Sequence, residues 1–242
     1  LITSQQEKQT FKVGENKIQS QIKIDNPRLW DVDDPYLYRL SIRISEEGSK
    51  AFDESSTRCG FRDFRFADGY FRLNGKRLFL KCSHTGDSFP IGIHLPPSPD
   101  LLQRDLLNVK AMGFNAIRYI SGVALKPHLD YCDEIGLMVY EEAAAAWCLN
   151  HSDKMAERFN LSTFGMIQRD RNHPSVVMWG LLNETVANPV FMHAVSLLPE
   201  VRKYDNSRLV MLNSGRFDGF TKGSGVFGPA TWRSASLLVP NI

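Results

Sequence analysis

Residues 169–185 read RDRNHPSVVMWGLLNET, and their middle, residues 175–182, is a run of mostly apolar and β-branched residues. Runs of this length are typical of a strand buried on both faces, as in a parallel sheet. Pro174 ends any helix before it, and Asn183-Glu184 follows where the strand should end. Parallel α/β folds place their chemistry at the carboxyl ends of strands. This stretch therefore predicts a buried parallel strand with a polar pair at its carboxyl end.

The Asn183-Glu184 pair has two interpretations. A carboxylate that follows an apolar strand can have its pKa raised by burial and then act as a general acid. Alternatively, Asn183 caps a helix and Glu184 lies in its first turn, where the helix dipole favours a negative charge. The dipeptide alone favours capping, because capping is the commoner role, and the surrounding sequence has to decide.

Towards the N-terminus of this stretch, helix signals alternate with short apolar runs. Ser98 and Pro99 have the character of a helix start, while Gly113 and Gly136 stand where helices should stop. We predict strands at 77–83, 115–119, 137–141, 175–182 and 208–213, with helices between them and the last helix interrupted near Pro199. Five strands with four intervening helices are a β/α barrel pattern, although a full barrel needs eight strands in ~250 residues. We therefore expect an α/β TIM (β/α)8 barrel truncated after about five strands.

Before the barrel the pattern has period two. Apolar residues alternate with polar ones in 18–24 and again in 38–44, which is typical of antiparallel strands with one wet face. We expect a partial β-sandwich to about residue 66. Asp68-Gly69 and Asn74-Gly75 then predict two tight hairpins, because these pairs supply the positive φ angles that two-residue turns require.

The composition is that of an ordinary globular chain. It has 242 residues, 43% hydrophobic and 23% charged, with a net charge of +2, so no basic footprint suggests nucleic acid. Nor does any apolar run approach the ~20 residues of a membrane span. Its four cysteines (Cys59, Cys82, Cys132 and Cys148) lack metal-ligand spacing. The chain begins at Leu1 and not at a methionine, so the sequence does not decide whether a signal peptide precedes it. A cytoplasmic location is favoured over a periplasmic or secreted one.

Several blocks together resemble the family 2 glycoside hydrolases, the group of β-galactosidases, β-glucuronidases and β-mannosidases. They are NPRLW (26–30), PYLY (35–38), GFR (60–62), FRLNGK (71–76), MGFNAIR (112–118), CDEIGL (132–137), RDRNHPSV (169–176) and Asn183-Glu184. They occur in the family's order, so the resemblance covers most of the chain. It implies a partial immunoglobulin-like β-sandwich at 1–66 and the first part of the catalytic TIM barrel at 67–242.

The resemblance also implies the chemistry. Retaining glycosidases use two carboxyl groups, one as acid/base and one as nucleophile. Glu184 matches the acid/base, and Asn183 matches the residue that binds the hydroxyl beside the anomeric carbon. The family's nucleophile, a second glutamate on a later strand, would lie beyond Ile242. We therefore expect the 242 residues alone to be inactive and the parent protein to be a retaining exo-β-glycosidase, β-galactosidase-like, with no cofactor.

Four further residues are candidates for sugar binding. Arg118 ends its strand where it either orients a carboxylate or forms an ion pair at the barrel rim. Glu142 matches a family glutamate in the sugar subsite, while its neighbour Glu141 faces the other way. Trp147 offers an aromatic face to a sugar, unlike the mid-strand Trp179, which is expected in the core. His84 either binds a hydroxyl or is structural.

Departures from the family limit the assignment. HTGD (84–87), ISGV (120–123) and EEAAA (141–145) stand where many members carry histidine-containing loops. The missing histidines argue against magnesium binding through Glu142 and put the galactoside assignment in doubt. The alternatives are a β-mannosidase or β-glucuronidase specificity, or a non-catalytic carbohydrate-binding relative. We expect a carbohydrate partner, no nucleic acid or membrane, and leave a homo-oligomer of the full-length protein open.

Overall fold

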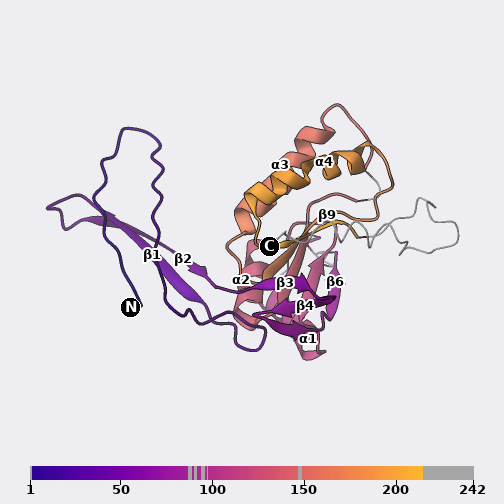
Figure 1. Ribbon diagram of the computed structural model, residues 1–242, viewed down its shortest axis with the longest axis horizontal. Helices are drawn as coiled ribbons and strands as arrows, with labels where there is room; N and C mark the ends of the chain where they lie inside the picture. The colour runs from indigo at the N-terminus through magenta and orange to yellow at the C-terminus, as the bar shows by residue number, and fades with distance from the viewer. Residues whose placement is uncertain are drawn as a thin grey trace.

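The computed structural model describes residues 2–86, 89, 92, 93, 96, 98–146 and 149–214. Its centre is a five-stranded sheet in the order β10-β9-β8-β7-β6, and every neighbouring pair is parallel. Four helices connect these strands (Figure 1). The elements are β6 (Cys82–Thr85), α1 (Pro99–Ala111), β7 (Ala116–Tyr119), α2 (Lys126–Ile135), β8 (Met138–Glu142), α3 (Met155–Asp170), β9 (Val176–Leu182), α4 (Pro189–Tyr204) and β10 (Leu209–Asn213). The predicted succession of five parallel strands is confirmed.

Local sequence signals explain where these helices begin and end. The Ser98 side chain accepts a hydrogen bond from Leu101 N, and Pro99 occupies the first turn of α1. Gly136 ends α2 in the left-handed conformation, at φ 71°. A side chain on Gly136 would also meet the carbonyl oxygen of Val32 at 2.4 Å. Glycine is therefore required at this stop by its backbone conformation and by a close backbone approach.

Two expectations about boundaries are wrong. The strand predicted at 77–83 is divided between β5 (Lys76–Leu78), which belongs to a separate hairpin ribbon, and β6. The helix expected to break near Pro199 continues through it as α4. Buried Val190, Ala194 and Val201 hold one face of α4 against the core. That burial outweighs the backbone hydrogen bond which a proline cannot donate.

The hairpin ribbon is formed by β3 (Phe64–Ala67), β4 (Tyr70–Leu73) and β5, paired antiparallel. Both predicted turns are confirmed: Asp68 and Gly69 have φ of 54° and 80°, and Asn74 and Gly75 have φ of 52° and 79°. The ribbon packs Phe64 and Leu73 against the first residues of three barrel strands, Ala116, Met138 and Leu209. It therefore covers the amino end of the parallel sheet.

The N-terminal region forms an arm rather than a packed sandwich in the part of the chain described. The strands β1 (Tyr38–Ser45) and β2 (Phe52–Cys59) pair antiparallel and extend away from the sheet (Figure 1). The strand predicted at 18–24 is absent from the described structure, and Ile18 and Ile22 are exposed there. Alternating residues suit a strand, but its backbone also needs a pairing partner, which the described residues do not supply.

The arm is attached through the segment before β1. Trp30 is fully buried, and its Nε1 donates to the carbonyl oxygen of Asp133, at 2.8 Å. Lys110 Nζ donates to the carbonyl oxygen of Val32 at 2.7 Å. In addition, Arg58 pairs with Glu134 on α2. These contacts join the segment to α1 and α2 from the sheet's amino end.

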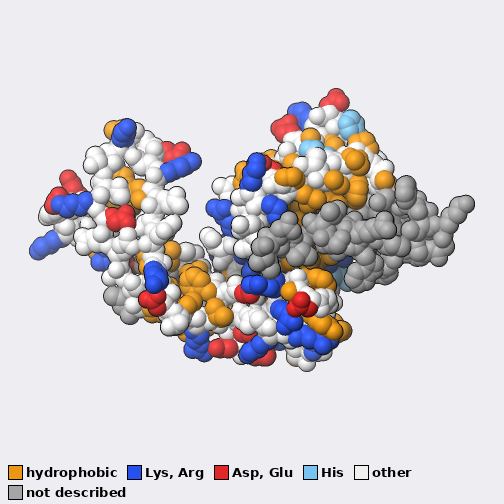
Figure 2. Space-filling view, in the orientation of Figure 1, with side chains coloured by type: hydrophobic (Ala, Val, Ile, Leu, Met, Phe, Trp, Pro, Cys, Tyr) orange, Lys and Arg blue, Asp and Glu red, His pale blue; other side chains and the backbone are white. Residues whose placement is uncertain are grey.

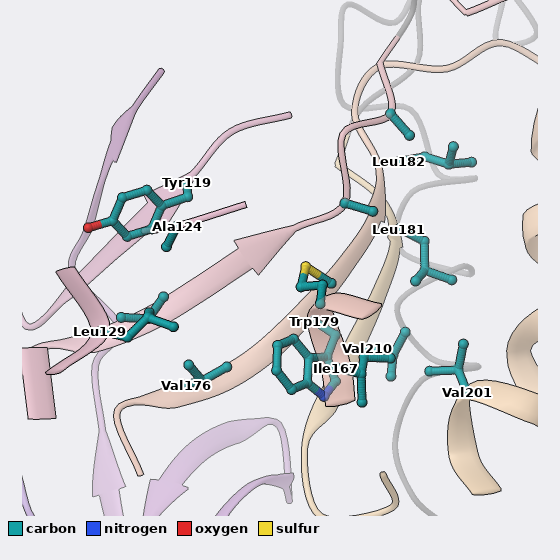
Figure 3. Packing of buried hydrophobic residues seen from close by; sticks show 14 of the residues in the cluster. Tyr119, Ala124, Leu129, Ile167, Val176, Trp179, Leu181, Leu182, Val201 and Val210 are labelled. Atoms are coloured by element: carbon teal, nitrogen blue, oxygen red, sulfur yellow. The ribbon is translucent and has the colours of Figure 1, made fainter. Parts of the chain in front are cut away.

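The main core lies between the outer face of the sheet and the helices. Trp179 and Leu181 of β9 pack with Leu129 of α2, Ile167 of α3 and Val201 of α4 (Figure 3). Trp179 has no exposed surface, and its Nε1 donates to Asp205 Oδ2 at 2.9 Å. The expectation that Trp179 is a core residue is confirmed.

The outer surface carries both charged and apolar side chains. Hydrophobic side chains gather over α3 and α4 on the face that Figure 2 shows. Leu161 of α3 and Met192 of α4 are both exposed. Within the described residues, none of the helices has the length and apolar character to cross a bilayer.

Candidate active site

The polar candidates gather at the carboxyl end of the parallel sheet. Arg118 lies in β7, Glu142 is the last residue of β8, and Asn183 directly follows β9. Because parallel strands end at one edge, three residues far apart in sequence come together there. The amino end is covered by the ribbon, so the carboxyl end is the edge available for a site.

A hydrogen-bonded network joins these residues. Arg118 Nη2 lies 2.6 Å from Glu142 Oε1, and its Nε donates to the same oxygen at 2.8 Å. Arg118 Nη2 also donates to Asn183 Oδ1, at 2.7 Å, and to Ser214 Oγ. The Ser214 hydroxyl in turn donates to Asn183 Oδ1 at 2.7 Å. The ion pair of Arg118 at the rim is thus observed, with Glu142 as its partner, while a role for Arg118 in sugar binding stays a prediction.

The network fixes how the Asn183 amide is turned. Its Oδ1 accepts from two donors, Arg118 and Ser214, which occupies the lone pairs of that oxygen. The Nδ2 group is then the part of the amide left to meet a ligand. Asn183 itself is 5% exposed, and its backbone N–H donates to the carbonyl oxygen of Ala145 at 3.0 Å.

Glu141 and Glu142 face opposite sides of β8, as expected for neighbours in a strand. Glu142 accepts from Arg118 and, through Oε2, from the backbone N–H of Ser121 at 2.8 Å. Glu141 instead accepts from the backbone N–H of Ala124 at 3.0 Å. Its side chain is buried beside Asp170, and the loss of solvent raises its pKa well above the ordinary value. Glu141 therefore belongs to the outer layer and Glu142 to the candidate site.

Glu184 is not in a helix, so the capping interpretation of Asn183-Glu184 is wrong. Helix α4 begins only at Pro189, and its cap is Asn188, whose side chain accepts from Phe191 N at 3.0 Å. Glu184 is partly exposed and has a φ of 52°, in the left-handed region. Such a conformation costs a residue other than glycine about 1–3 kcal/mol and is concentrated at functional sites.

Gly180 makes room for the network. A side chain at this position of β9 would stand 2.4 Å from Glu142 Cγ and 2.6 Å from Tyr140 Cε2. Glu142 and Tyr140 therefore occupy the space beside the Gly180 backbone. The Arg118 guanidinium lies 5.1 Å from the centre of the Tyr140 ring. A missing side chain in one strand thus lets a charged and an aromatic group of the next strand pack inside the curved sheet.

Among the described residues, the remaining site candidate is His84, which is not part of this hydrogen-bonded network. His84 is paired in register with Arg118 across β6 and β7, so the two side chains share a face, and His84 is exposed. Trp147 lies outside the described residues. Sequence reasoning did not select Ser214, although it directly follows β10 and so satisfies the rule that selected the others.

Among the described residues, one group of potential metal ligands has its ligand atoms within 4.8 Å of one another: Asp130, Asp133 and His173. His173 Nδ1 lies 2.6 Å from Asp133 Oδ2, while Asp133 Oδ1 accepts from Ser175 N at 2.9 Å. Asp130 pairs with Lys126. The group therefore ties the turn before β9 to α2, and its atoms are already bonded within the protein.

Successive βα units that place polar residues at the carboxyl ends of a parallel sheet are typical of β/α-barrel proteins. Residues 64–223 match the family model "Glycosyl hydrolases family 2, TIM barrel domain", and residues 2–62 match the model "Glycosyl hydrolases family 2". The chain belongs to glycosyl hydrolase family 2.

Individual members of the family are similar to this chain. The chain is 34% identical over 202 residues to a beta-galactosidase of Thermoanaerobacter pseudethanolicus, covering 82% of this chain and 26% of that protein. It is 33% identical over 186 residues to a putative beta-glucuronidase of Formosa agariphila, covering 75% of this chain and 22% of that protein. The crystal structure of a Parabacteroides merdae beta-glucuronidase superposes with a TM-score of 0.70 at 31% identity, over 77% of this chain and 25% of that one. The chain thus spans about a quarter of each relative.

Proposed function

We propose that this chain supplies the acid/base half of the active site of a retaining exo-β-glycosidase. The observation that carries the proposal is the network at the carboxyl edge, in which Arg118 joins Glu142 to Asn183, the residue before Glu184. Membership of a glycosyl hydrolase family supports the same chemistry. Glu184 protonates the glycosidic oxygen as the bond breaks and later removes a proton from the attacking water.

The other residues bind and orient the sugar in this proposal. Asn183 presents its Nδ2 group to the hydroxyl beside the anomeric carbon, a hydrogen bond that strengthens at the transition state. Arg118 and Ser214 hold the amide in that orientation. Glu142 accepts from a second sugar hydroxyl, and His84 and Trp147 are further proposed sugar-binding residues. Arg118 pairs with the Glu142 side chain, which is fully buried, and so fixes where its oxygens point.

The nucleophile in this proposal is a second carboxylate from outside the 242 residues. Retention requires it to stand about 5–5.5 Å from the acid/base across the scissile bond. Residues 1–66 then form part of an immunoglobulin-like sandwich, and residues 67–242 form the N-terminal part of the catalytic barrel. The two family matches, which meet between residues 62 and 64, support this division.

A β-galactoside is the substrate that we propose first, because the name of the Thermoanaerobacter relative specifies it. A β-glucuronide is the second candidate, since the Formosa and Parabacteroides relatives carry that name. The sugar's C6 group is what differs between them, a hydroxymethyl in one and a carboxylate in the other. A panel of aryl β-galactosides, β-glucuronides and β-mannosides separates the specificities.

Turnover of this panel by the whole protein that carries the chain tests the proposal. Replacing Glu184 by Gln keeps the shape and removes the proton, so kcat/KM for a phenyl glycoside should fall at least ~100-fold. Glu157→Gln is the matched control, because Glu157 is exposed on α3, on the helical side of the sheet. Undiminished activity in Glu184→Gln would overturn the assignment. Sugar binding without turnover by the wild-type protein would instead support the non-catalytic alternative.

A further inference from the structure

Asn213 forms a two-point contact with the backbone beside Glu184. It is the last residue of β10 and is 1% exposed. Its Oδ1 accepts from the backbone N–H of Thr185 at 3.1 Å, and its Nδ2 donates to the carbonyl oxygen of the same residue at 2.8 Å. One side-chain amide thus satisfies both backbone groups of Thr185, in the way that a neighbouring strand would.

The residue on the other side of Glu184 is tethered as well. The backbone N–H of Asn183 donates to the carbonyl oxygen of Ala145, beyond the end of β8. The Thr185 hydroxyl then donates back to the carbonyl oxygen of Asn183, at 3.2 Å. Glu184 is therefore the middle residue of a short segment that is held at both ends, by Ala145 in the loop after β8 on one side and by Asn213 on the other.

The backbone of Glu184 needs this support. Its φ of 52° is one that L-residues other than glycine avoid, because the Cβ atom approaches the following carbonyl group. Without an external restraint, the peptide on either side would rotate back to an ordinary conformation and re-aim the side chain. The contact from Asn213 acts on the peptide that directly follows, so it opposes that rotation.

We propose that Asn213 is a positioning residue, which holds the Glu184 carboxyl in the direction needed for proton transfer by clamping Thr185. The inference rests on the proposed acid/base role of Glu184. A general acid has to lie within hydrogen-bond reach of the leaving oxygen, and small displacements of a catalytic group cost large factors in rate. Asn213 has no contact with substrate in this role; it acts through the backbone of Thr185.

Substrates with different leaving groups test such a role. Dinitrophenolate leaves without protonation, whereas phenolate needs a proton from the general acid. In the whole protein, Asn213→Ala should lower kcat/KM for the phenyl glycoside by ~30-fold or more and for the dinitrophenyl glycoside by less than about threefold. Asn108→Ala, at an exposed position of α1, is the control and should leave both rates unchanged. An equal loss on both substrates, or no loss, would overturn the inference.

Asn213→Asp adds a second readout, which a merely structural defect would not give. A protonated carboxylic acid has the acceptor and the donor of the amide, so it restores both contacts to Thr185. An ionised carboxylate has no donor and repels the Thr185 carbonyl oxygen. The ratio of variant to wild-type kcat/KM for the phenyl glycoside should therefore rise as the pH falls. A ratio independent of pH would contradict the proposed clamp.

A third measurement separates failure of this inference from failure of the proposed function. Hydrogen exchange of the Thr185 amide should be faster in Asn213→Ala than in the wild-type protein, whether or not Glu184 is catalytic. If Glu184→Gln is fully active, the function of Glu184 is wrong. If Glu184→Gln loses activity with the phenyl glycoside while Asn213→Ala keeps both its activity and its slow exchange, only the role of Asn213 is wrong.

Discussion

Arg118 and Glu142 form an ion pair at the ends of two neighbouring strands, with 2.6 Å between Nη2 and Oε1. The Glu142 side chain has no exposed surface, while that of Arg118 is 18% exposed. Arg118 and the backbone N–H of Ser121 together compensate for a carboxylate that has been taken out of water. Because the same guanidinium also contacts Asn183, stability and the geometry of the candidate site depend on one side chain.

Arg118→Ala should therefore impair both folding and activity. It leaves the Glu142 carboxylate buried and unpaired, which costs about 3–5 kcal/mol of unfolding free energy. It also releases the Asn183 amide, so kcat/KM on an aryl glycoside should fall at least about tenfold. Urea unfolding and steady-state kinetics of the whole protein measure the two effects. Arg104→Ala, at an exposed position of α1, should change neither.

Gly180→Ala should destabilise the protein by about 1–3 kcal/mol, because the added methyl group collides with Glu142 and Tyr140. The matched control is Gly165→Ala in the middle of α3, where an added Cβ has nothing within 4 Å. That change should stabilise the protein by about 0.5–1 kcal/mol, since alanine is the better helix former. Equal melting temperatures for the two variants would show that Gly180 does not make room for the network.

His128 should make stability depend on pH in the acidic range. Burial lowers the pKa of His128 to about 4, from an ordinary value of 6.5. The unfolded chain then binds a proton that the folded chain does not, so stability falls as the pH drops from 6.5 towards about 4. His128→Phe keeps a ring against Tyr119 and cannot ionise. Denaturant titrations across this range should show a shallower fall for the variant, and parallel curves would refute the prediction.

The 242 residues expressed alone should fold poorly and show no glycosidase turnover. Among the residues that the structure describes, β6 and β10 are the edges of the parallel sheet, and exposed edges invite aggregation. Several hundred Å² of uncovered apolar surface costs on the order of 10 kcal/mol, which is comparable with the ~5–15 kcal/mol stability of a whole domain. Size-exclusion chromatography, thermal unfolding and an aryl glycoside assay test this against the longer protein. A cooperative, active monomer would show that the chain contains its own nucleophile.

The sequence by itself determined the local structure of the βα units. The positions of Ser98, Gly113, Gly136 and the two Asx-Gly turns set where elements start and stop, because each signal acts through the backbone within a few residues. Period and strand order then placed Arg118, Glu142 and Asn183 at one edge, and the resemblance to the family identified Glu184 as a candidate.

Only the tertiary structure decided how these residues are held. Three contacts matter here, and each joins segments far apart in the sequence: Asn213 with Thr185, Ser214 with the Asn183 amide, and Gly180 with Glu142. The last pair is 38 residues apart and meets only because the two residues pair in register across β8 and β9. The strand expected at 18–24 failed for the same reason, because pairing depends on a partner elsewhere in the chain. Side-chain direction and strand pairing are set by packing across the sheet, which no local pattern encodes.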